Sequence, residues 1–131
     1  MAPRSSSPPE TVRTEADLLA RLLGLYDQER QIYIRVLDLS RQQGEIIAQG
    51  GPLSRVQGVL EQKNACLEAI RRMEAAEQRH KREWEQGRSR WSATGKARLH
   101  AALQAVGALI EDILRCEERN DMQLIEQAKE F

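Results

Sequence analysis

The chain has 131 residues, of which 40% are hydrophobic, 31% charged and 4% aromatic, with 20 basic and 20 acidic residues. This length provides one domain, and the aliphatic and charged composition is typical of a folded helical protein rather than a disordered chain. A net charge of zero argues against a protein that depends on many phosphate contacts, such as a nucleic-acid binder.

The N-terminal residues are rich in proline, serine and charge, so we expect a disordered lead-in over 1–13 and a single helical domain over 14–131. The lead-in has no apolar run like that of a signal peptide, and no stretch of the chain approaches the ~20 apolar residues of a membrane span. The cysteines, Cys66 and Cys116, lack metal-ligand spacing and are expected to be small buried hydrophobes. These features predict a cytoplasmic protein.

The first predicted helix begins at Thr14, whose side chain can accept a hydrogen bond from the amide of Asp17. Over 18–47, hydrophobic residues recur every three or four positions in two adjacent rows, which together are wide enough to face two partner helices. The glycine-glycine-proline run at 50–52 predicts the first turn, because glycine suits a left-handed C-cap and proline suits the start of the next helix.

A second predicted helix starts at Leu53, with a hydrophobic seam that weakens beyond Met73. The glycine-bounded segment 87–95 predicts the next interruption, with Ser92 or Thr94 as the N-cap of a third helix. No strand-like alternation is evident in the sequence. Three segments of similar length joined by short turns predict an all-α fold, an elongated three-helix antiparallel bundle with coiled-coil-like packing.

Two charged residues, Glu29 and Lys63, fall within the predicted hydrophobic seams. Counting an antiparallel hairpin about the first turn places Glu29 opposite Arg71 and Arg72, and Lys63 opposite Asp38. Because an unpaired charge in a bundle seam is costly, we expect both residues to reach opposite charges and to fix the register of the helices.

The segment between Arg71 and Arg98 contains nine basic and four acidic residues, with Trp84 and Trp91 among them. Aromatic rings beside cations are typical of proteins that grip single-stranded nucleic acid. We favour the alternative, in which the tryptophans close the end of the bundle, Trp84 is largely buried against the first helix and Trp91 is more exposed. The acidic excess of the third helix is available to pair with the basic segment.

The sequence contains no nucleotide-binding loop, zinc-ligand pair or nucleophile elbow. His80 and His100 are isolated, and the paired acids at 111–112 and 117–118 lack the Glu-x-x-His motifs of a di-metal bundle. We therefore expect that the protein is not an enzyme and has no catalytic residues, cofactor or metal.

A less generic pattern spans residues 18–127. It begins with a leucine pair, an acid, an aromatic residue, two hydrophobic pairs and a glutamine pair, and continues with a glycine turn and leucines around a lysine. In the last helix (113–127) an asparagine is followed by a leucine. The residues are, in chain order, Leu22, Leu23, Glu29, Tyr33, Val36, Leu37, Gln42, Gln43, Ile46, Ile47, Gly50, Leu53, Leu60, Lys63, Leu67, Ile70, Asn120 and Leu124. This pattern resembles the flagellar export chaperone family typified by FlgN. The chain departs from the family in Pro52, in the tryptophan-rich junction at 84–91 and in its short tail after Asn120.

The resemblance implies a cytoplasmic chaperone that holds hook–filament junction proteins before type III export, with an amphipathic client segment laid against an apolar helix face. The third helix has more apolar positions than one bundle seam requires, and such a surplus is typical of a partner site. We therefore expect the partner-binding residues to be Leu103, Val106, Leu109, Ile110, Ile113 and Leu114.

Other interpretations remain open at this point. Both apolar rows of the third helix are equally consistent with a bundle core. A structural coiled-coil adaptor or homodimer without an export role is the main alternative function, and a single-stranded nucleic-acid binder is a weaker third. We expect a protein client, no nucleic acid and no membrane span.

Overall fold

The structure is a computed structural model that describes residues 14–130, so the predicted lead-in over 1–13 lies outside the described residues. It contains α1 (Glu15–Ala48), α2 (Leu53–Ala76), α3 (Gln78–Gln86), the short 3-10 helix η1 (Arg88–Arg90) and α4 (Ala93–Lys129). This part of the chain is all-helical and has no strand, as the sequence predicts. None of the helices within 14–130 is long and apolar enough to cross a membrane.

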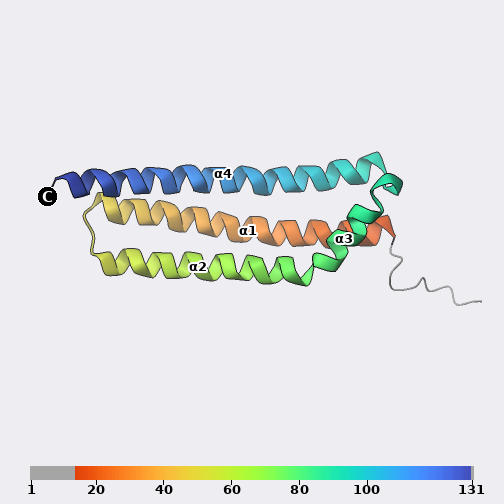
Figure 1. Ribbon diagram of the computed structural model, residues 1–131, viewed down its shortest axis with the longest axis horizontal. Coiled ribbons are helices and arrows are strands. Elements are labelled where there is room, and N and C mark those ends of the chain that lie inside the picture. The colour runs from red at the N-terminus through yellow and green to blue at the C-terminus, as the bar shows by residue number, and fades with distance from the viewer. Residues whose placement is uncertain (1–13, 131) are drawn as a thin grey trace, which may run out of the picture.

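The described residues form four α-helices, so the prediction of a three-helix bundle is wrong in the number of helices. The second predicted helix is divided at Glu77, where α3 turns away from the line of α2 (Figure 1). The sequence pattern did not reveal the break, because neither glycine nor proline lies at it. Arg21 of α1 donates a hydrogen bond to the Glu77 carboxylate at 2.9 Å, which ties the bend to the first helix.

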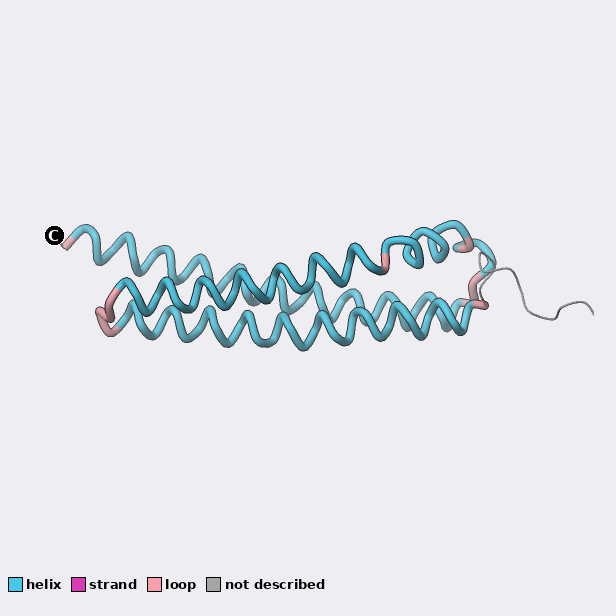
Figure 2. Tube along the Cα trace, turned by 90° about the horizontal axis from the view of Figure 1, so that it is seen from below, coloured by secondary structure: helices cyan, strands magenta, loops and turns pink. Residues whose placement is uncertain are grey.

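α1 is the central helix of this elongated bundle, with α2 and α4 on either side of it (Figure 1). α2 runs antiparallel to α1, whereas α4 runs parallel to it and crosses it obliquely, so that its C-terminal end stands apart from the turn between α1 and α2 (Figure 1, Figure 2). Cα atoms within 8 Å of each other join α1 to α2, to α3 and to α4, but none joins α2 to α4. The two flanking helices are therefore held together mainly through α1.

The hydrophobic core consists of two clusters along α1. The first joins α1, α3 and the N-terminal half of α4, and its buried members are Leu18, Leu19, Leu22, Leu25, Tyr26, Trp84, Leu99 and Val106. The second joins only α1 and α2, and its buried members are Leu39, Ile46, Ile47, Val56 and Val59. Within the described residues, the part of α4 beyond Ile110 adds no side chain to either cluster, and its buried side chains are Cys116 and Asn120.

The helix ends confirm the signals in the sequence. Thr14 caps α1 by accepting a hydrogen bond from the amide of Asp17 at 3.1 Å. Gly50 has a φ of 66°, the left-handed conformation that glycine adopts without steric cost. Ser92 caps α4 by accepting a hydrogen bond from the amide of Gly95 at 2.9 Å.

Candidate protein-docking surface

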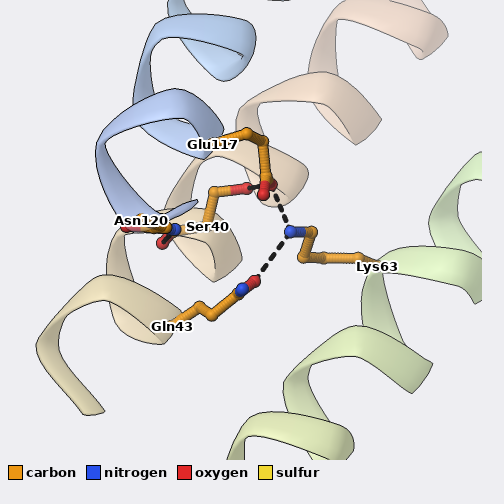
Figure 3. A network of polar contacts seen from close by, with 5 residues as sticks. All are labelled: Ser40, Gln43, Lys63, Glu117 and Asn120. Atoms are coloured by element: carbon orange, nitrogen blue, oxygen red, sulfur yellow. Dashed lines mark hydrogen bonds and ion pairs between the residues drawn. The ribbon is translucent and has the colours of Figure 1, made fainter. Parts of the chain in front are cut away.

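A polar network links α1, α2 and α4 (Figure 3), and its α1 members Ser40 and Gln43 lie in the last third of that helix. The ammonium of Lys63 donates to Oε1 of Gln43 at 2.8 Å and forms an ion pair with Glu117. The hydroxyl of Ser40 donates to the same carboxylate, and Nδ2 of Asn120 donates to the backbone carbonyl of Ser40 at 2.9 Å. The network therefore bridges α2 and α4 across α1, where the two flanking backbones stay apart.

Lys63 is buried and paired, but its ion-pair partner is not the predicted one. It reaches Glu117 of α4, whereas Asp38 is exposed and lies 3.9 Å from Arg41 on its own helix. The antiparallel pairing counted from the first turn related residues of α1 only to residues of α2. It could not show that α4 lies parallel to α1 and brings a carboxylate beside Ser40.

Glu29 contradicts the other half of that prediction. Its side chain is 4% exposed, it forms no ion pair with any residue in 14–130, and its Oε2 atom has no hydrogen-bond partner. Arg71 and Arg72 pair with Glu68 on their own helix instead. Burial raises the pKa of the Glu29 carboxyl, and the positive charge of Lys81 opposes that rise only in part.

Exposed leucines lie on the sides of α4 and α2 that carry the ion pair. With about 3.6 residues per turn, residues 103, 114 and 124 fall on the same side of α4 as Glu117. Leu103, Leu114 and Leu124 are 44%, 63% and 44% exposed. On α2, Leu60 lies one turn from Lys63 and is 39% exposed. We call these four leucines the leucine face.

The six predicted partner-binding residues do not share one environment. Leu103 and Leu114 belong to the leucine face, and Val106 is a buried member of the first core cluster. The others are half-buried, and one of them packs against that cluster: Leu109, Ile110 and Ile113. The sequence did not single out Leu60 and Leu124 as partner-binding residues, because the periodicity of one helix does not show which side its neighbour leaves uncovered.

An open pocket of about 640 Å³ lies between α1, α3 and α4, at the N-terminal end of α4. Its walls are apolar, built from Leu22, Tyr26, Trp84, Leu99 and Leu103. Its charged lining residues are Lys81, Arg88, Lys96 and a single carboxylate, Glu85. We call this the basic pocket.

The two tryptophans contact each other at the same end of the bundle. Their ring centroids are 5.2 Å apart with planes inclined by 18°, and Nε1 of Trp91 donates to the backbone carbonyl of Trp84 at 2.6 Å. The guanidinium of Arg90 lies 5.2 Å from the Trp91 ring. Trp84 is 6% exposed and Trp91 is half-buried, which confirms the predicted order of burial. The rings close the bundle rather than offer free faces for base stacking.

A comparison against protein families gave a family match for this chain. The family model described as FlgN protein matches residues 18–131, a range that contains the polar network, the leucine face and the basic pocket. Comparisons with curated proteins and with solved structures gave no match. Because the family model covers nearly the whole chain, the chain belongs to the FlgN family, the flagellar export chaperones that its sequence resembles.

Proposed function

We propose that this protein is a cytoplasmic type III export chaperone that holds hook–filament junction proteins until they are exported through the flagellar apparatus. Membership of the FlgN family supports the chaperone role. The identity of the clients rests on the resemblance of the chain to that family. The leucine face is the observation that supports the mode of docking.

The leucine face is suited to an amphipathic helix. Its four leucines lie on two helices whose backbones do not contact each other, so an added helix can pack against both at once. Fully burying an exposed leucine contributes about 1.5–3 kcal/mol, and such contacts carry the affinity of helix-in-groove complexes. A client helix on this face would form a bundle together with α1, α2 and α4.

The six predicted partner-binding residues of α4 keep a place in this proposal, but only some of them contact the client directly. Leu103 and Leu114 are exposed enough to contact a client directly. Val106 and Ile110 pack toward the first core cluster and hold α4 in position. Leu109 and Ile113 are half-buried and lie beside the contact residues on α4.

The proposal is tested by placing a charge on the leucine face. Leu103→Asp and Leu114→Asp are compared with Ile34→Asp, which changes a similarly exposed hydrophobic residue of α1 (39%). Binding of C-terminal segments of junction proteins is measured by titration calorimetry, and helicity by circular dichroism. We expect the two α4 variants to lose at least about tenfold in affinity with unchanged helicity, because a charge buried against apolar side chains is strongly unfavourable.

The Ile34→Asp variant serves as the control and should bind as the wild type does. Unchanged affinity in both α4 variants would refute docking on the leucine face. Sedimentation velocity of the wild type and the three variants measures the oligomeric state, which distinguishes a chaperone from a structural adaptor or homodimer. If the wild type is a dimer that Leu114→Asp converts to a monomer, and no client segment binds, the face belongs to a homodimer.

A further inference from the structure

We infer that the basic pocket holds the acidic C-terminal end of the docked helix, and so fixes the direction in which that helix lies on the leucine face. The inference rests on the proposed function, because it assumes a helical protein segment on the leucine face. It adds the chemistry of one end of that segment: carboxylates beside apolar side chains.

The pocket and the leucine face are continuous. Leu103 belongs to both, and Leu99, one turn earlier on α4, forms part of the pocket wall. A helix that covers Leu114 and continues along α4 toward its N-terminus therefore meets Leu103 and then the pocket. α4 begins at Ala93, so a docked helix that extends no further than α4 has its end at this pocket.

Positive charge exceeds negative charge in the pocket. Arg88 pairs with Glu85 at 3.3 Å, which leaves that carboxylate already neutralised. Lys81 contributes a second cation, paired with Glu74 and 5.5 Å from the centroid of the Tyr26 ring.

The remaining cation is Lys96. It is exposed at the rim, and no salt bridge within 4 Å joins it to another residue of 14–130, although its charge acts on the nearby Glu15 carboxylate and helps to lower the pKa of that group. An added carboxylate would therefore find a cation without a salt-bridge partner, next to the apolar walls of the pocket.

The opposite end of the leucine face carries negative charge. Asp121, one turn beyond Glu117, is exposed on the same side of α4 as Leu124, and Glu118 is exposed beside it. A helix has a partial positive charge at its N-terminus and a partial negative charge at its C-terminus. Both ends are matched only when the docked helix runs antiparallel to α4, with its C-terminus in the basic pocket.

Nucleic acid is the less favoured occupant of the pocket. Binding along a phosphate backbone relies on many unpaired cations, whereas two of the three cations here already pair with carboxylates. The ring of Trp84 is only 6% exposed and has one face stacked on Trp91, so it offers little surface to a base.

The test uses two synthetic helical peptides with the same leucine spacing and the same composition. One carries glutamates and a free carboxylate at its C-terminal turn and lysines at its N-terminal turn. The other has the two charged turns exchanged and an amidated C-terminus. Fluorescence anisotropy of the labelled peptides is measured with the full chain, with Lys96→Glu, and with the matched control Arg119→Glu, an exposed cation of α4 outside the pocket.

We expect the wild type to prefer the peptide with the acidic C-terminus by roughly tenfold, Lys96→Glu to lose or reverse that preference, and Arg119→Glu to retain it. Equal affinity for both peptides, unchanged by Lys96→Glu, would overturn the assigned direction while leaving docking on the leucine face intact. If neither peptide binds the wild type, both the direction and the proposed docking fail. Competition of the acidic peptide by a single-stranded oligonucleotide at matched salt would assign the pocket to nucleic acid and overturn the inference.

Discussion

The ammonium group of Lys63 in α2 meets the carboxylate of Glu117 in α4, although no Cα atom of α2 lies within 8 Å of one in α4. The pair therefore joins the two flanking helices through side chains alone. Gln43 and Ser40 of α1 bind its two members, so the contact also ties both flanking helices to the central one. We predict that it fixes the register of the helices rather than adding much net stability.

Removing the cation should weaken the fold. Lys63→Met keeps the aliphatic stem and leaves Glu117 with Ser40 as its remaining network partner. We expect the free energy of unfolding to fall by about 1–3 kcal/mol, because a partly buried carboxylate loses its counter-charge. Urea denaturation measures this change. The double variant Lys63→Met/Glu117→Gln should recover part of the loss, and strictly additive costs would show that the pair is not coupled.

Neutralising Glu29 should stabilise the protein at neutral pH. The carboxyl is buried without an ion pair among the described residues, and burial raises its pKa above the ordinary value. A raised pKa in the folded state means that ionisation destabilises the fold above that pKa, and that the penalty disappears as the pH falls through it. Glu29→Gln should therefore raise the unfolding free energy by about 1–2 kcal/mol at neutral pH.

Thermal unfolding measured as a function of pH checks this prediction. The gain from Glu29→Gln should shrink toward zero in acid, where the wild-type carboxyl is already neutral. Glu45→Gln, an exposed carboxylate of the same helix, is the control and should show no comparable gain. A gain of the same size at every pH would contradict the explanation by ionisation.

Glu15 should have the opposite pH dependence. Its carboxylate accepts hydrogen bonds from the hydroxyl of Ser92 and from its backbone amide (2.8 Å), and these bonds lower its pKa below the ordinary value. Their contribution is present above the pKa of the unfolded chain and is lost as the pH falls through the lower pKa of the fold. The midpoint of unfolding of the wild type should fall in acid more steeply than that of Glu15→Gln, and parallel curves would exclude this role.

Local signals predicted much of the fold. The caps at Thr14 and Ser92 and the turn at Gly50 were readable because each depends on a few adjacent residues. The caps and the turn require no knowledge of where distant helices lie. The burial of Trp84 against α1 followed from the same antiparallel count about the first turn that was applied to Glu29, which needs only the position of that turn.

The parts that sequence did not predict depend on contacts between helices. The bend at Glu77 has no glycine or proline and coincides with a hydrogen bond to α1, a partner 56 residues away in the chain. The pairing of Lys63 with Glu117 requires the parallel placement of α4 on α1. For the same reason, periodicity identified the apolar positions of α4 but not which of them are exposed. Of the six predicted partner-binding residues, only Leu103 and Leu114 are.

The C-terminal half of α4 should be the most easily opened part of the bundle. Beyond Ile110 it adds no side chain to the two core clusters, and its buried side chains are only Cys116 and Asn120, whose amide donates to the Ser40 carbonyl. Fewer buried apolar contacts imply a lower free energy of local opening. In native-state hydrogen exchange, amides after Ile110 should therefore exchange faster than those from Leu99 to Ile110.

One substitution tests the contact between Asn120 of α4 and α1. A Cβ atom at Gly44 of α1 would lie 2.5 Å from Oδ1 of Asn120, closer than real contacts allow, so Gly44→Ala must displace the Asn120 side chain or the helix that carries it. Gly24→Ala changes the same helix where nothing lies within 4 Å of the new atom, and it should stabilise α1 by about 0.5–1 kcal/mol through helix propensity. Gly44→Ala should instead speed exchange after Ile110 while leaving Leu99 and its neighbours protected. Equal protection of both halves of α4 in Gly44→Ala would show that Asn120 does not hold the C-terminal half, whereas loss of protection throughout would show that α4 detaches as one unit.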